Sequence, residues 1–103
     1  WLPVKIGASS EGGFNSRLAV IDGVPQMSYS RDLGTDSLLG VRLAESSSAD
    51  GALVTDWLNQ DQVTNASQMQ DGSTEHDLAV IDGYPALVFF DATADDLVYA
   101  IRF

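Results

Sequence analysis

The sequence predicts an all-β protein built from two tandem units of four antiparallel strands each. A six-residue segment that begins at Leu18 recurs without change at Leu78, 60 residues further along the chain. In both copies an Asp-Gly pair separates two apolar runs, which is the strongest short-range signal for a β-hairpin. The apolar runs are short, β-branched or aromatic, and interrupted by glycine and proline, so they favour strands over helices.

The first hairpin of each unit turns at an Asp-Gly pair, Asp22-Gly23 in the first unit. A two-residue loop places Val20 opposite Pro25, at a position where the two strands exchange no hydrogen bond. The missing N–H of the proline therefore removes nothing from the ladder. Pro85 opposite Val80 repeats the arrangement in the second unit.

A third strand is expected to follow each hairpin, over Leu38–Leu43 and over Leu97–Phe103. The offset of 60 residues holds here without a gap, so that Arg42 is aligned with Arg102. The segments around Leu87 and Val98 are nearly continuous in apolar residues, which is typical of strands covered on both faces.

A fourth strand is expected to begin at a tryptophan in each unit. Trp57–Thr64 supplies it in the first unit, after a polar loop at residues 45–51, and Trp1–Ile6 occupies the same place in the repeat. The chain is thus predicted to be one domain of two repeats, about 1–43 and 44–103. Repeats of this length each fail to bury their own apolar face, and they stack on neighbours.

Composition narrows the classes of partner. The 103 residues carry a formal net charge of −10, which disfavours binding to nucleic acid or to anionic membrane surfaces. No apolar run is long enough to span a membrane, so we expect no membrane insertion. The chain has no cysteine and one histidine, so neither disulfides nor a metal site can stabilise a domain this small. Partner subunits are the remaining source of stability.

No catalytic residue, metal ligand or cofactor site is predicted. His76 stands between two acids, but no serine is marked out as its nucleophile, so it is interpreted as a loop residue. The acidic segment Asp91–Asp96 lacks the glycine and late glutamate of a calcium-binding loop and is interpreted as a turn. Four arginines, Arg17, Arg31, Arg42 and Arg102, are too few and too regularly placed to predict a sialic-acid site.

The repeat resembles the blades of bacterial secreted and surface β-propellers. The matching residues are Leu78–Ala86 and Asp96–Ala100, with weaker matches at Leu18–Pro25 and Leu39–Arg42. Ser48-Ala49-Asp50-Gly51 before Trp57 resembles the Asp box of sialidase-type propellers, although the spacing to the tryptophan is longer. The resemblance implies that the Leu-Ala-Val strand is innermost in each blade and the tryptophan-led strand outermost. It implies a location outside the cell or on a cell or virion surface.

Two blades do not close a propeller, which has about four to eight. We therefore expect Trp1–Ile6 of one copy to complete the last blade of a neighbour, as a homo-oligomer or a filament. A trimer is favoured over a dimer or a tetramer. The predicted assembly strands comprise Trp1, Leu2, Val4, Ile6, Val98, Ala100, Ile101 and Phe103. The predicted function is that of an extracellular structural or adhesive subunit.

The alternative function is that of a carbohydrate-binding propeller lectin. Its candidate residues for stacking on sugar rings are Trp1, Trp57, Tyr29 and Tyr84, and glycans would then be the partner. The opposing interpretation is that the tryptophans anchor the outer strands. Asn65-Ala66-Ser67 is an N-glycosylation sequon, which matters only in a host that glycosylates.

Overall fold

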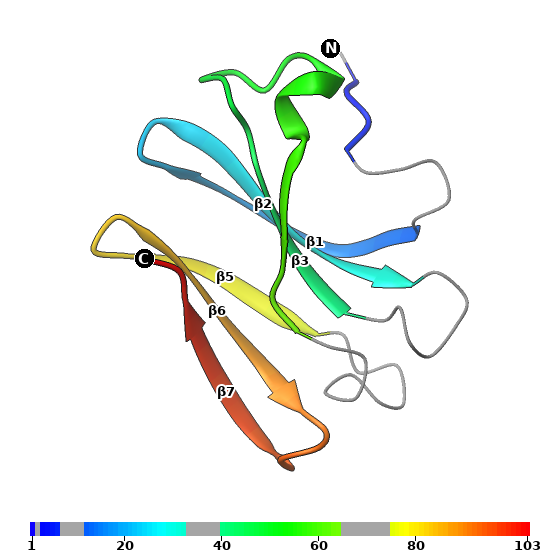
Figure 1. The fold of residues 1–103 in the computed structure, drawn as a ribbon, viewed down its shortest axis with the longest axis vertical. Helices are drawn as coiled ribbons and strands as arrows, with labels where there is room; N and C mark the ends of the chain where they lie inside the picture. Colours follow the sequence, from blue (N-terminus) through cyan, green and yellow to red (C-terminus); the bar gives the residue numbers. More distant parts are fainter. Residues whose placement is uncertain (2, 7–11, 33–39, 65–74) are drawn as a thin grey trace.

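The computed structural model describes residues 1, 3–6, 12–32, 40–64 and 75–103, and within them the regular elements are strands apart from one 3-10 turn at Val54–Trp57. A four-stranded antiparallel sheet, the first sheet, has the order β1-β2-β3-β4, and a three-stranded antiparallel sheet, the second sheet, has the order β5-β6-β7 (Figure 1). The strands are β1 (Gly12–Ile21), β2 (Val24–Asp32), β3 (Gly40–Glu45), β4 (Asn59–Gln62), β5 (His76–Ile81), β6 (Tyr84–Asp91) and β7 (Asp96–Ile101).

Both Asp-Gly hairpins form in the predicted register. Val20 pairs with Pro25 and Val80 with Pro85, on either side of two-residue turns. Asp22 and Gly23 have φ of +52° and +79°, and the second turn repeats these values closely. Two successive positive φ angles make a type I′ turn, whose twist matches that of the flanking strands. The Asp-Gly pair therefore fixes the register of the first two strands of each sheet.

The ungapped alignment of the third strands is wrong. Tyr29 of β2 pairs with Arg42 of β3, whereas Phe89, its counterpart in β6, pairs with Val98 of β7. Arg42 therefore corresponds in the fold to Val98, 56 residues later, and not to Arg102. The cause is the length of the connections, because Arg31 pairs with Gly40 in the first sheet but Asp91 pairs with Asp96 in the second.

The predicted fourth strand forms in the first sheet, where β4 lies within Trp57–Thr64 and pairs with β3. The second sheet has three strands among the described residues, and β7 is its edge. Residues 3–6 are not in a strand in this chain. The fold class is therefore confirmed as all-β, with one antiparallel sheet of four strands and one of three in the described part of the chain.

The two sheets pack on each other through one face each, here called their inner faces, and β1 lies near β5. A buried cluster joins Val41 of β3 to Leu87 and Phe89 of β6. Half-buried Leu78, Val98 and Ala100 of the second sheet and Val63 pack around it. The opposite faces, here called the outer faces, point away from this contact. Since side chains alternate along a strand, every residue next to an inner-face residue belongs to an outer face.

Candidate functional site

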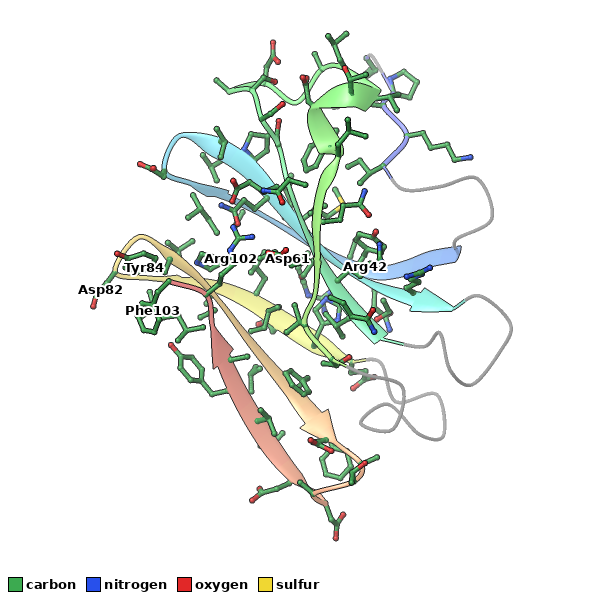
Figure 2. The ribbon with its side chains drawn as sticks, viewed as in Figure 1. Arg42, Asp61, Asp82, Tyr84, Arg102 and Phe103 are labelled. Atoms are coloured by element: carbon green, nitrogen blue, oxygen red, sulfur yellow. The ribbon has the colours of Figure 1, made fainter. Side chains whose placement is uncertain are left out.

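The β7 edge contains half of the predicted assembly residues. Val98 and Ala100 point to the inner face and are half-buried against the core cluster. Phe103 follows the strand and is exposed. Its ring meets that of Tyr84 edge to face, with centroids 5.3 Å apart (Figure 2). The edge of β7 is therefore flanked by apolar side chains in the described part of the chain.

The other half of the predicted assembly site, the opening segment Trp1–Ile6, does not lie beside β7. Val4 and Ile6 pack against the outer face of the first sheet, beside the buried Tyr29, Ala44 and Trp57. Trp1 is exposed, and Leu2 lies outside the described residues. The segment and β7 lie on opposite sides of the molecule (Figure 1). The structure thus does not bring the two predicted halves of the assembly site together within one chain.

The hollow beneath the opening segment has a volume of about 240 Å³. Its lining consists of Val4, Ile6, Ser16, Met27 and Tyr29. Well-packed protein cores leave few voids larger than a water molecule. The opening segment therefore covers the first sheet without filling the space under it.

The polar loop before β4 is a compact hydrogen-bonded turn. The Ser48 hydroxyl donates to Asp56 at 2.9 Å and accepts from the Gly51 amide at 3.1 Å. The Trp57 indole N–H donates to the Gly51 carbonyl oxygen at 2.9 Å. A Cβ at Gly51 would lie 2.7 Å from the Trp57 ring, so only glycine fits beneath it. A 3-10 turn at Val54–Trp57 connects this loop to β4.

Two of the four rings proposed for sugar stacking are buried. Trp57 and Tyr29 are each 5% exposed, and the Tyr29 hydroxyl donates to Gln60 at 2.8 Å. A sugar ring needs an open aromatic face, so these two residues cannot serve that role in this structure. Trp57 instead packs in a buried cluster with Tyr29 and Ala44, just before β4 begins at Asn59. Trp1 and Tyr84 are exposed, one in the opening segment and one on the second sheet.

Arg102 connects the second sheet to the first. Its guanidinium donates to Asp61 at 2.7 Å, to Gln26 at 3.3 Å and to Glu45 (Figure 2). Burial lowers the pKa of this guanidinium. The hydrogen bonds to Asp61 and Glu45, together with the negative charges of these two residues, raise the pKa by more than burial lowers it, so the pKa lies above its ordinary value. Arg42 projects from the outer face and donates to Gln60 at 3.3 Å. The two arginines therefore differ in role as well as in position.

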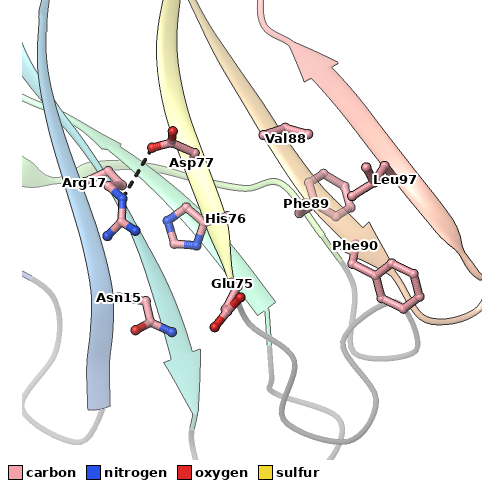
Figure 3. Close-up of a pocket in the computed structure, with 9 residues that line it drawn as sticks. All are labelled: Asn15, Arg17, Glu75, His76, Asp77, Val88, Phe89, Phe90 and Leu97. Carbon is pink, nitrogen blue, oxygen red and sulfur yellow. Dashed lines mark ion pairs between the residues drawn. The ribbon is translucent and has the colours of Figure 1, made fainter.

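A hollow of about 440 Å³ lies beside β5, near the end of β1 (Figure 3). Arg17 and Asp77 on its wall form an ion pair at 3.3 Å, and both side chains are at least half exposed. The interpretation of His76 as a loop residue is wrong, because it is the first residue of β5. It lines the hollow and is buried, and its Nε2 lies 3.0 Å from the Ser28 hydroxyl. Sequence analysis missed this pair because Ser28 and His76 are 48 residues apart. Ser28 has no exposed surface, so a substrate cannot reach its oxygen and the pair links the two sheets.

The acidic segment Asp91–Asp96 forms the turn between β6 and β7, as predicted. The Asp91 carboxylate accepts from the amides of Thr93 at 2.8 Å and Ala94 at 3.1 Å, which closes the turn. The described residues contain no group of three or more histidine, aspartate or glutamate side chains that could hold a metal ion. The sequon at Asn65 lies outside the described residues.

Comparison with known proteins returned no match, whether by family model, among curated proteins or among solved structures. No helix in the described ranges is long and apolar enough to cross a membrane. The functional interpretation therefore depends on the surfaces of the two sheets. The outer face of the second sheet is the largest concentration of exposed apolar side chains among them, with Ile81, Tyr84, Val88, Phe90, Leu97 and Tyr99.

Proposed function

We propose that this protein is an extracellular structural or adhesive subunit that self-assembles by strand exchange into a β-propeller ring or a filament. The proposal depends on a difference between the two sheets: both are built from the same repeat, but the first has four strands and the second has three among the described residues. In the first sheet β4 covers the edge of β3. Among the described residues β7 is an edge strand of the second sheet, and edge strands are templates for pairing with another chain.

The side chains of the opening segment alternate in the way expected of a strand paired with the edge of β7. If Trp1 is aligned with Trp57, the register between β3 and β4 places Lys5 opposite Tyr99 and Val4 opposite Ala100. Val4 and Ile6 then point to the inner face, and Lys5 points to the outer face. This alternation of apolar and charged side chains suits a strand at the edge of a sheet.

A hollow of about 250 Å³ between β4 and β7 would receive the two inward side chains. Its lining is largely apolar, with Leu43, Val63, Pro85, Leu87, Ala100 and Ile101 among its residues. Full burial of an exposed valine or isoleucine side chain contributes about 1.5–3 kcal/mol, and the net gain here is smaller because Val4 and Ile6 are already half-buried in the single chain. In this structure the opening segment lies on the far side of the first sheet, away from this hollow.

Cysteine crosslinking tests the proposal directly, since the natural chain has no cysteine. Directly opposed residues of adjacent strands have Cβ atoms about 4.5–5.5 Å apart, a distance that a disulfide spans after a small adjustment. The double variant Lys5→Cys/Tyr99→Cys should form disulfide-linked chains on mild oxidation. The matched variant Lys5→Cys/Thr93→Cys places the second cysteine in the turn beyond β7 and should remain uncrosslinked. Equal crosslinking of the two variants, or none in either, would overturn strand exchange.

A further inference from the structure

The two outer faces correspond, position by position, to the two inner faces that already pack together in this chain. The repeat equates the inner face of the first sheet with the outer face of the second. Val41 and Leu43 of β3 correspond to Leu97 and Tyr99 of β7, as the strand registers show. In the same way Ser28 of β2 corresponds to Val88 of β6.

Burial at these equivalent positions differs sharply. Val41 and Leu43 are 0% and 2% exposed; Val41 packs against Leu87 and Phe89 of the second sheet, and Leu43 lines the hollow between the sheets. Leu97 and Tyr99 are 71% and 59% exposed. The exposed face is also the more apolar of the two, since Val88 and Phe90 replace the buried serines Ser28 and Ser30. A contiguous exposed apolar surface of this kind marks an interaction site.

The outer face of the first sheet corresponds in turn to the inner face of the second. Leu18, Met27 and Tyr29 correspond to Leu78, Leu87 and Phe89, which pack against the first sheet. Every one of these positions is apolar or aromatic in both units. The chain therefore carries both halves of a sheet-to-sheet contact whose internal copy is already formed.

We infer that the outer face of the second sheet docks onto the outer face of the first sheet in a second copy of this chain. This inference rests on the proposed self-assembly and adds the surfaces that meet. The contact is continuous with the internal interface and repeats its geometry. Because the two faces differ, the contact is head-to-tail, and it propagates into a ring or a filament.

Docking requires the opening segment to leave the first sheet. Val4 and Ile6 cover Tyr29 in the single chain, whereas Leu18 and Val20 beside them are exposed. Residues 3–6 are not paired as a strand in this structure, so their removal breaks no sheet ladder. Strand exchange and docking are therefore coupled. When the opening segment of one chain pairs with β7 of a neighbour, it uncovers the outer face of its own first sheet. The second sheet of that neighbour then docks on the uncovered face.

Charge substitutions on each face test the inference. Leu97→Glu blocks the second sheet, Leu18→Glu blocks the first, and Leu53→Glu is the matched control in a loop. The three leucines are 71%, 65% and 62% exposed in the single chain, so the substitutions should leave its fold intact. An unpaired glutamate buried in the contact should weaken self-association by at least about a hundredfold, whereas the control should assemble like the unsubstituted protein.

Mixing the two blocked variants gives the decisive result. Leu97→Glu retains a functional first sheet and Leu18→Glu a functional second sheet, so an equimolar mixture should form heterodimers and nothing larger by native mass spectrometry. Self-association of Leu18→Glu alone would show that the second sheet pairs with itself and would overturn the inference. Normal assembly of both variants would overturn it while leaving self-assembly in place. A monomeric unsubstituted protein would remove the proposed function as well.

Discussion

Arg102 should contribute more to stability than any other ion-paired residue that the structure describes. Its guanidinium contacts Glu45 and Asp61 across the interface between the sheets, and about a third of its side chain is exposed. The half-exposed Asp61 contact contributes about 0.5 kcal/mol, and the more buried Glu45 contact about 1–1.5 kcal/mol. Arg102→Met retains the aliphatic stem but removes both ion pairs and the hydrogen bond to the buried Gln26, so the free energy of unfolding should fall by at least about 1.5–2 kcal/mol.

Urea denaturation and thermal unfolding measure this loss, at one low protein concentration because association also stabilises the fold. Tm should fall by about 10 °C, since 1 kcal/mol corresponds to roughly 4–8 °C in a domain of this size. Arg17→Met is the matched control, because Arg17 also joins the two sheets but its pair with Asp77 is exposed. It should cost less than about 0.5 kcal/mol. Equal losses in the two variants would refute the assignment of stability to the Arg102 contacts.

Three further substitutions test local features of the fold. Gly51→Ala should lower the free energy of unfolding by at least about 1 kcal/mol more than Gly23→Ala, because both glycines have positive φ but only the Gly51 Cβ would meet the Trp57 ring; equal losses would contradict this. Trp57→Phe should cost about 1–3 kcal/mol, since the buried Gly51 carbonyl loses its indole donor, and urea denaturation measures it. Ser28→Ala should cost about 1–2 kcal/mol by removing the partner of His76, and an unchanged midpoint would show that the hydrogen bond does not contribute.

Local sequence signals predicted the hairpins in full. The Asp-Gly pairs fixed both turns and the pairing of Val20 with Pro25, because positive φ at two successive positions admits few other residues. Strand β4 was also predicted, from its place after Trp57. These features depend on residues close together in the chain, so the local sequence is enough to predict them.

Features that depend on long-range packing were not predicted. The sequence alignment paired Arg42 with Arg102. In the structure, the register of β3 on β2 and of β7 on β6 is set by the connections between these strands, which differ in length. Burial of Tyr29 depends on Val4 and Ile6, which come from a distant segment. The opening segment was expected to be a strand, but a strand requires a partner edge. In this chain the side chains of that segment contact a sheet face instead.

The mass of the unsubstituted protein under native conditions tests self-assembly most directly. Native mass spectrometry over a wide range of protein concentration should show a discrete species of two, three or four chains, or very large assemblies if the head-to-tail contact does not close. In either assembly the outer face of the second sheet is buried by a neighbouring chain. The backbone amides of β6 and β7 should therefore exchange their hydrogens more slowly than in the single chain. A single chain at every concentration, with fast exchange along β7, would contradict the proposal.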